Sequence, residues 1–257
     1  MVTFLCFLMT ATFTTPLFAK PESDYKKAES TVQALLKDDK NLYTIESKAW
    51  KQRPGGVLVL TYKKNMDTAK DFRANLFLWE RNAKGGTISA QTEIIPAIQF
   101  EKSWSYSDAS FKLDLAPYKV SAEVMAIGVR FLRTVEFPAG ENTTETLLLH
   151  RQMNDKFSLI HSIDTRVEDA QRGPDELWNF KSLVIVDQKQ TESFYDLLSK
   201  ETATKSRMME QKEKPLTCLK TRRFRWQGTR YVSQDAGCDG TNWATEIKKK
   251  HSKSVKP

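Results

Sequence analysis

The sequence predicts a mainly β protein, an antiparallel sandwich or a small propeller-like array, with one short helix near its N-terminus. Two observations predict this fold class. After residue 56, apolar side chains either alternate with polar ones or form short continuous runs, and both patterns are typical of strands. Turn-forming residues separate these runs at short intervals, so consecutive strands are expected to be antiparallel neighbours.

The helix is expected over residues 23–37, where Ser23 can cap it and apolar residues fall near helical spacing. About ten strands are expected after it. The clearest follows the turn signal Pro54-Gly55-Gly56, and Gly128 inside another apolar run indicates a bulge or a close approach of two backbones. The expected strands include residues 57–62, 72–79, 111–115, 124–132, 146–150, 157–160, 183–186, 223–226 and 229–232, with hairpin turns at Asn154-Asp155 and Gln227-Gly228.

Residues 1–19 have the plan of a cleavable secretory signal. They carry no charged side chain, contain an apolar run, and end on a small residue, Ala19, after Pro16. A membrane-spanning helix needs about 20 strongly apolar residues, whereas this segment includes five threonines and a proline. We therefore expect a periplasmic or secreted protein that has no transmembrane anchor once the signal is removed.

The remaining chain is expected to form one β-rich domain over residues 20–247. A weak boundary is possible at residues 199–217, a polar stretch that is expected to be an exposed connector or a loose helix. Residues 248–257 are expected to be a disordered basic tail.

The cysteines support export. Removal of the signal also removes Cys6 and leaves Cys218 and Cys238 as an even pair. In an oxidising compartment these two are expected to form a disulfide. Two sulfurs without nearby histidines cannot complete a zinc site, so no metal is expected.

The net charge of +8 is concentrated at the C-terminal end. Residues 200–257 hold fifteen Lys or Arg against six Asp or Glu, while the rest of the chain is close to neutral. This distribution favours local attraction to an acidic partner or an anionic component of the cell envelope, rather than nucleic acid. The alternative is a solvated end that aids solubility.

The predicted hairpin at residues 223–232 concentrates this charge. On a strand, Arg223 and Arg225 share one face and Phe224 and Trp226 share the other. The candidate binding residues are therefore Arg223, Arg225, Arg230 and Trp226. The arginine face could bind carboxylates or phosphates, or it could be a charged edge that prevents aggregation of the sheet. The six tryptophans fall about one to an element, which fits core packing better than a ligand platform.

No catalytic, phosphate-binding or dinucleotide-binding motif is present, and no cofactor is expected. The best acid/base or metal cluster would combine His150, His161 and Asp164 across the Asn154-Asp155 hairpin. The alternative is two ordinary histidines at strand ends. A glycan hydrolase would need two carboxylates across a cleft. Asp164 and Glu168 are the residues to test for it.

Three stretches resemble a pattern in uncharacterised exported bacterial proteins. Residues 113–120 (LDLAPYKV), 126–130 (AIGVR) and 145–151 (ETLLLHR) are similar to segments running APYRL, AFGVR and ETLLLF in those proteins, and residues 224–231 resemble a hairpin of the type YRWDGKRY. Some proteins of this general kind look like periplasmic inhibitor or immunity proteins that block cell-wall-cleaving enzymes. The resemblance therefore implies binding rather than catalysis.

The function expected from the sequence is that of an exported, non-enzymatic binding protein, an inhibitor or an envelope accessory protein. Its partner is expected to be a protein or an anionic component of the envelope. A cell-wall or glycan-directed hydrolase and an anion- or surface-binding module are the alternatives.

Overall fold

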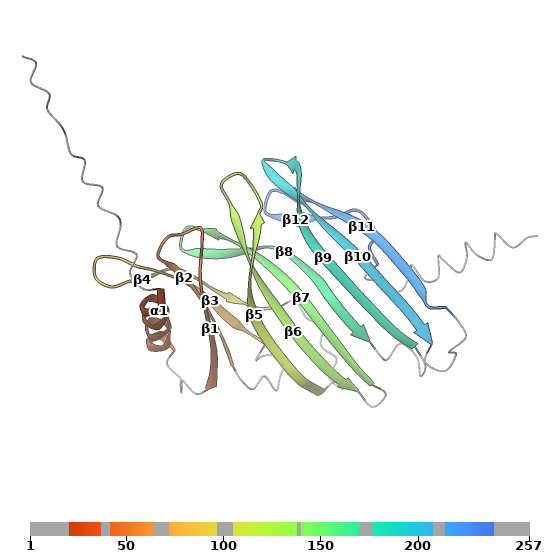
Figure 1. Ribbon diagram of the computed structural model, residues 1–257, viewed down its shortest axis with the longest axis horizontal. Coiled ribbons are helices and arrows are strands. Elements are labelled where there is room, and N and C mark those ends of the chain that lie inside the picture. Colours follow the sequence, from red (N-terminus) through yellow and green to blue (C-terminus); the bar gives the residue numbers. More distant parts are fainter. Residues whose placement is uncertain are drawn as a thin grey trace, which may run out of the picture.

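The computed structural model describes residues 21–36, 42–63, 72–96, 105–137, 140–169, 176–207 and 214–238. Within them the chain forms one helix, α1 (Pro21–Leu35), and twelve strands in two antiparallel sheets (Figure 1). The four-stranded sheet contains β1 (Tyr43–Ala49), β2 (Gly56–Lys63), β3 (Ala74–Glu80) and β4 (Thr87–Ile94), in chain order. The mainly β fold class with a short N-terminal helix is confirmed.

The eight-stranded sheet is also a meander in chain order, with β5 and β12 as its two edges. Its strands are β5 (Ser105–Lys119), β6 (Met125–Phe137), β7 (Gly140–Met153), β8 (Lys156–Asp169), β9 (Glu176–Thr191), β10 (Phe194–Arg207), β11 (Leu216–Gln227) and β12 (Arg230–Val232). Most are 12 to 16 residues long. They are therefore longer than the expected strands, because the sequence signal marks only their apolar parts.

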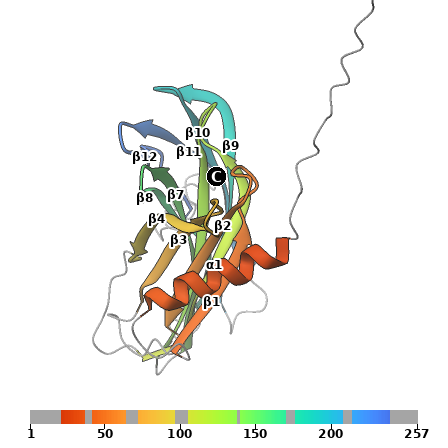
Figure 2. The same cartoon turned by 90° about the vertical axis from the view of Figure 1, so that its left-hand side faces the viewer.

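The four-stranded sheet is buried on both faces, which explains the continuous apolar run in β2. Val57 and Val59 face α1, while Leu58 and Leu60 face the eight-stranded sheet. A strand buried on both sides needs apolar residues at every position rather than at every second one. Figure 2 shows α1 lying across the strands of this sheet.

Helix α1 attaches to the four-stranded sheet through one apolar stripe and three polar contacts, one of which is a hydrogen bond from Ser47 Oγ of β1 to Glu29. Ala28 and Val32, four residues apart, are fully buried against the sheet. Asp24 accepts two hydrogen bonds from the guanidinium of Arg81, and Tyr25 Oη accepts one from the Ala49 backbone N–H (3.2 Å). The helix ends at Leu35, two residues earlier than expected.

A continuous core joins the two sheets. The four-stranded sheet contributes leucines from β2 and β3, and the eight-stranded sheet contributes aromatic and aliphatic residues from β5 to β8. Members of this core include Leu58, Leu60, Leu76, Leu78, Phe111, Phe131, Leu148 and Phe157. Phe111 and Phe131 pack with ring centroids 4.7 Å apart.

The eight-stranded sheet divides between β8 and β9. These strands pair only from Arg166 to Asp169. The other parts of β9 to β12 separate from β8 and pack against the side chains of β7 and β8 instead. This second core contains Leu147, Leu149, Ile160 and Ile163 from β7 and β8, and Leu197, Phe224, Trp226 and Tyr231 from β10 to β12.

The edge of β5 is closed by side chains of β1. Glu46 Oε2 accepts the Leu113 N–H and Lys48 Nζ donates to the Leu113 carbonyl, both at 2.7 Å. Glu46 and Lys48 also form an ion pair with each other. Charged side chains that occupy backbone groups in this way protect a sheet edge from pairing with another chain.

Several expectations about the elements can be compared directly with the structure. The two hairpins at residues 154–155 and 227–228 are present. Residues 199–207, expected to be a connector or a loose helix, instead form the second half of β10. Lys200 and Thr202 lie on the exposed face of this strand, whereas the polar Ser199 and Glu201 are buried on its other face and hydrogen-bonded to each other. The expected signal at residues 1–19 and the tail at 248–257 lie outside the described residues.

Gly86 provides a test of the packing beneath α1. Its φ of +150° suits glycine, and a Cβ there would lie 1.9 Å from the Trp79 ring, which is buried in the core. We expect Gly86→Ala to lower the free energy of unfolding by about 3 kcal/mol, measured by urea denaturation. Gly85→Ala is the matched control, because its φ is +119° but no atom lies within 4 Å of the added Cβ. Equal losses in both variants would contradict the predicted collision.

Candidate functional site: a basic face on the C-terminal strands

The hairpin of β11 and β12 forms as its alternation predicts. Gly228 has a φ of +62° at the turn, and Arg225, Trp226 and Gln227 pair with Val232, Tyr231 and Arg230 respectively. Phe224 and Trp226 are buried, whereas Arg225 and Arg230 are exposed.

Trp226 belongs to the core of the hairpin. Its ring stacks on Phe194 at 4.0 Å and meets Tyr231 edge-on at 5.2 Å. The guanidinium of Arg151 lies over the same ring, 5.0 Å from its centroid. The side chain is only 3% exposed. Trp226 was one of the four predicted binding residues, but it packs beneath the surface and does not form part of it.

Arg223 is held by two carboxylates of the same chain. Its Nη1 donates to Asp187 and, at 3.0 Å, to the buried Asp196. The hydrogen bonds to Asp187 and Asp196 raise the pKa of Arg223, and the hydrogen bond from Arg223 lowers the pKa of Asp187. Thr191 donates to the other oxygen of Asp196. The positive charge of Arg223 is therefore largely neutralised within the protein.

Arg225 and Arg230 have a different environment. Both are exposed, and neither forms an ion pair with any residue that the structure describes. Arg225 lies on the same face of β11 as Arg223, and Arg230 is opposite Gln227 on that face. Of the three predicted arginines, these two remain available to an external anion.

The exposed face continues across β9, β10 and β11. Lys200 pairs with Leu183 on one side and Thr221 on the other, and Thr202 pairs with Lys181 and Leu219 in the next position. The two leucines are 61% and 73% exposed. We call this surface the outer face; it consists of Lys181, Leu183, Ile185, Leu198, Lys200, Thr202, Leu219, Thr221, Arg223 and Arg225.

Sequence reasoning missed most of the outer face. Leu183 lies in the run Leu183-Val184-Ile185-Val186, which predicts a strand but does not indicate which of its side chains are exposed. The structure buries Val184 and Val186 partly against the second core, while Leu183 points to solvent. In the sequence, the exposed side of β11 is indicated only by the alternation of its residues, in which Leu219 falls two residues before Thr221.

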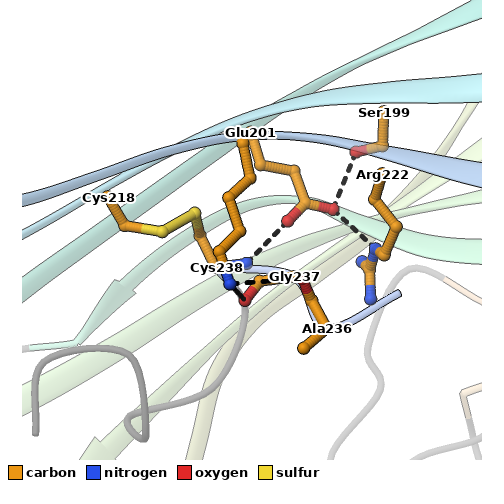
Figure 3. The surroundings of a disulfide bond; sticks show 8 residues. Ser199, Glu201, Cys218, Arg222, Ala236, Gly237 and Cys238 are labelled. Atoms are coloured by element: carbon orange, nitrogen blue, oxygen red, sulfur yellow. Dashed lines mark hydrogen bonds and ion pairs between the residues drawn. A yellow bond between two sulfur atoms is a disulfide. The ribbon is translucent and has the colours of Figure 1, made fainter. Parts of the chain in front are cut away.

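The opposite face of these strands holds a buried carboxylate, Glu201 (Figure 3). Its Oε1 accepts from Arg222 Nε at 2.8 Å and from Ser199 Oγ at 3.0 Å, and its Oε2 accepts the Cys238 N–H at 2.7 Å. A buried charge is tolerated only with such partners. This arrangement is structural, because each oxygen already has a donor.

The donor from Cys238 comes from a short segment that crosses this face after β12. We call residues 233–238 the strap. The disulfide between Cys218 and Cys238 fixes its end to β11, as predicted, and Lys220 Nζ donates to the carbonyls of Ala236 and Gly237 (Figure 3). A Cβ on Gly237 would lie 2.5 Å from Glu201 Oε2, so the strap lies directly against the carboxylate.

The two histidines of the strands do not form a site with Asp164. His161 is buried among aromatic rings, with its centroid 4.5 Å from that of Phe224 and 6.0 Å from that of Tyr231. Asp164 accepts a hydrogen bond from Thr146 at 2.7 Å. Within the described parts of the chain, no three His, Cys, Asp or Glu residues are grouped so that they could hold a metal ion.

Glu168, the other carboxylate considered for hydrolysis, forms a surface ion pair. Arg166 donates to both of its oxygens, at 2.9 and 2.8 Å, and this hydrogen bonding lowers the pKa of Glu168. Burial lowers the pKa of His150 and of His161 to about 4, and for His161 the nearby Arg222 adds to the effect. Both imidazoles are therefore neutral near pH 7.

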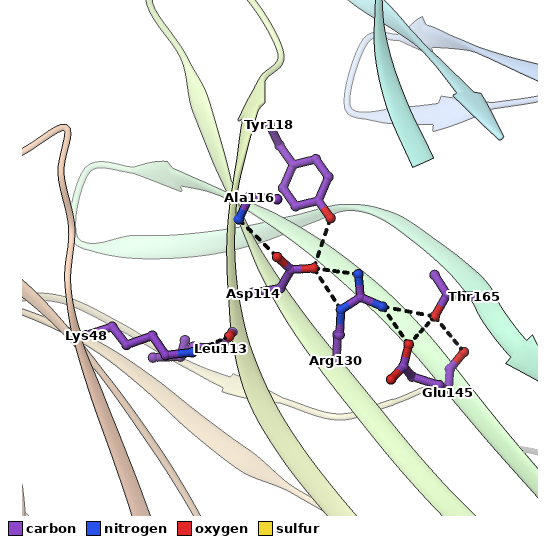
Figure 4. A network of polar contacts seen from close by, with 8 residues as sticks. All are labelled: Lys48, Leu113, Asp114, Ala116, Tyr118, Arg130, Glu145 and Thr165. Carbon is purple, nitrogen blue, oxygen red and sulfur yellow. Dashed lines mark hydrogen bonds and ion pairs between the residues drawn. The ribbon is translucent and has the colours of Figure 1, made fainter. Parts of the chain in front are cut away.

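Residues 113–120, 126–130 and 145–151 converge on one polar network (Figure 4). Arg130 lies between Asp114 and Glu145, with hydrogen bonds of 2.8 Å from Nε and 2.5 Å from Nη1. Thr165 Oγ1 donates to Glu145, and Tyr118 donates to Asp114 at 3.0 Å. These residues come from residues 113–120, 126–130 and 145–151, with β8 supplying the threonine.

The network fixes a bulge in β5. Asp114 pairs with Gly128 and Tyr118 with Ala126, so residues 115–117 bulge away from β6. Burial alone would raise the pKa of Asp114, but the Ala116 N–H, the Arg130 guanidinium and the Tyr118 hydroxyl outweigh it and lower that pKa. A Cβ on Gly128 would lie 2.9 Å from the Asp114 carbonyl oxygen. The expected close approach at Gly128 is confirmed.

Comparisons with known proteins yield no relative. No family model, no curated protein and no solved structure matches the chain. Among the described residues, no helix has the length and apolar character needed to span a membrane.

The disulfide provides a test of the strap. Replacing Cys218 and Cys238 together by alanine should lower the free energy of unfolding by about 3 kcal/mol, because the bond closes a short loop of the unfolded chain. Their sequence separation is 20. Urea denaturation measures the loss. Adding a thiol reductant should reproduce it in the wild-type protein and change nothing in the double variant, whereas a wild-type midpoint unaffected by reductant would contradict the prediction.

The buried histidines predict a loss of stability in acid. Both have pKa values of about 4 in the folded protein against 6.5 for an ordinary histidine. The unfolded chain therefore takes up protons first as the pH falls from about 6.5 to about 4, at a cost of about 3 kcal/mol for each histidine. His161→Phe should remove roughly half of this pH dependence in denaturation experiments between pH 7 and 4. An unchanged pH dependence in that variant would show that other groups cause it.

Proposed function

We propose that this chain is an exported, non-enzymatic binding protein, and that the outer face binds an acidic protein partner. The observation that carries the proposal is the combination of exposed leucines with basic side chains on one flat face. The acidic residues beside that face already have partners within the chain: Asp187 and Asp196 are bonded to Arg223, and Glu168 of β8 is bonded to Arg166.

Electrostatics supports an acidic partner. Lys181, Lys200 and Arg225 are exposed on the outer face, and Arg230 extends the positive charge onto the hairpin. None of these four side chains pairs directly with another across the strands, but all lie on the same side of β9 to β12, so their fields add at the surface of that side. Such a field accelerates association with an acidic surface and disfavours basic partners.

The leucines favour a protein over a simple polyanion. Leu183 of β9 and Leu219 of β11 lie among the basic side chains, and the partly exposed Ile185 of β9 and Leu198 of β10 pair with each other next to Leu183. Exposed apolar side chains surrounded by polar ones are typical of protein interfaces. A nucleic acid or an acidic glycan would use the charges but would leave these leucines in water.

A second copy of the chain does not fit the outer face well. Two identical faces would bring Lys181, Lys200 and Arg225 against themselves, and like charges across an interface are unfavourable. The partner is therefore expected to be a different protein.

Export is the remaining part of the proposal. The Cys218–Cys238 bond fits an oxidising compartment such as a periplasm or the cell exterior. The signal expected at residues 1–19 points to the same compartment.

Charge reversal on the outer face tests the function. We expect Lys200→Glu combined with Arg225→Glu to weaken binding to the partner at least about tenfold, because attraction becomes repulsion. The partner is first captured from envelope extract with the wild-type protein and identified by mass spectrometry. Its affinity for each variant is then measured by calorimetry. A photoreactive residue at position 219 should crosslink to the same partner.

Lys27→Glu combined with Lys84→Glu is the matched control. Both lysines are exposed and lie outside the C-terminal strands, so the change in net charge is identical. Equal affinities for the two double variants would contradict the proposed surface. Turnover of a defined substrate by the purified protein, with no partner recovered, would overturn the function itself.

A further inference from the structure

Two neighbouring cavities meet at Trp50, away from the outer face. Both lie beneath the turn between β1 and β2, where that turn approaches the start of β6. Trp50 and Gln52 line both cavities. Three hydrogen bonds give the turn a defined shape: Trp50 N–H to Gly56, Arg53 N–H to Trp50 and Gly56 N–H to Arg53.

The first cavity has a volume of about 300 Å³ and mainly apolar walls. Ala126 and Ile127 of β6, both buried, form part of its lining, and Leu115 and Pro117 of the β5 bulge form another part. Lys51 and Gln52 are its polar side chains. It therefore offers an apolar surface with polar groups on one side.

The second cavity has a volume of about 350 Å³ and is more polar. It continues along the start of β6 past Glu123 and Met125, and reaches Asn154 in the turn between β7 and β8. Arg53 also lines it, and its guanidinium lies 5.7 Å from the centroid of the Trp50 ring. Arg53 forms an ion pair with Glu80 at 3.0 Å.

Hydrogen bonds of Asp114 fix the wall of the first cavity that residues 115–117 form. Residues 115–117 bulge from β5 because Asp114 accepts the Ala116 N–H at 3.0 Å and is itself bonded to Arg130 and Tyr118. A regular strand needs none of these side chains. Bulges commonly shape a binding site next to a sheet.

We propose that the cleft formed by these two cavities binds a short saccharide. The lining combines the three features that a sugar requires. Leu115, Pro117 and the β6 floor offer an apolar surface to the C–H groups of a ring. The exposed amides of Gln52 and Asn154 offer both a donor and an acceptor to neighbouring hydroxyls. Trp50 lines both cavities and offers them an aromatic ring, which is 8% exposed and otherwise packs in the core between the sheets.

The charges of the cleft favour a neutral ligand. Arg53 is paired with Glu80, and the two other charged side chains, Lys51 and Glu123, have opposite signs and line different cavities. A nucleotide or another polyanion would face Glu123 without a matching cluster of cations. This site is independent of the outer face and of the proposed protein partner.

Titration with neutral oligosaccharides tests the proposal. The probes are chitotetraose and cellotetraose, added to the ¹⁵N-labelled full chain at up to about 10 mM. At least one of them should shift the resonances of the Trp50 indole and of residues 115–117 and 126–127. Gln52→Ala combined with Asn154→Gly should weaken that binding at least about tenfold. Glycine suits position 154, where φ is +54°.

Gln190→Ala is the matched control, since it removes an exposed amide from β9 outside the cleft. Its affinity for the saccharide should equal that of the wild type, and its thermal midpoint and that of the double variant should stay near the wild-type value. The proposal is overturned if neither saccharide shifts these resonances, or if the double variant keeps its affinity. It is also overturned if the resonances of the cleft residues respond only to a bound polypeptide and to no sugar.

Discussion

The separation of β9 from β8 is the constraint on which the C-terminal half depends. After four paired residues the two strands part, and the other parts of β9 to β12 pack over the side chains of β7 and β8. One face of β10 and β11 is thereby committed to the interior, through Leu197 and Phe224 at one end and Ala203 and Cys218 at the other. The opposite face is exposed to solvent. For this reason the exposed lysines and leucines of these strands alternate with buried residues.

The strap completes this arrangement, because the packing of β9 to β12 on β8 does not reach the whole inner face. Ser199, Glu201 and Arg222 lie between the second core and the disulfide. Without the backbone N–H of Cys238, one oxygen of a buried carboxylate would lack its donor, at a cost of a few kcal/mol. The disulfide, the carboxylate and the close approach of Gly237 thus form one interdependent unit, and Figure 3 shows all of them at the same crossing.

Local pattern was enough to predict the hairpins, the disulfide, the close approach at Gly128 and the buried faces of Phe224 and Trp226. Each of these depends on residues near one another in sequence or on a single chemical pairing. The separation of β9 from β8 depends on contacts between strands that are distant in the sequence, so no local pattern indicates it. For that reason the exposure of Leu183 was not predicted, and the polar residues 199–207 were expected to be a connector or a loose helix rather than a strand. The cleft at Trp50 was equally hidden, since its walls come from turns and strands about seventy and one hundred residues apart in the sequence.

The surplus of positive charge in the sequence of the C-terminal end is larger than the positive charge that its surface presents to a partner. Arg222 forms an ion pair with Glu201, and Arg223 forms ion pairs with Asp187 and Asp196. Acidic residues of β9 and β10 therefore neutralise two of the four arginines in this hairpin. These acidic residues lie in the part of the chain that is neutral overall, or next to it. The charges that remain, Arg225, Arg230, Lys181 and Lys200, are fewer but share one exposed side of the sheet. Their placement beside exposed leucines, rather than the net charge of the chain, determines which surfaces can bind there.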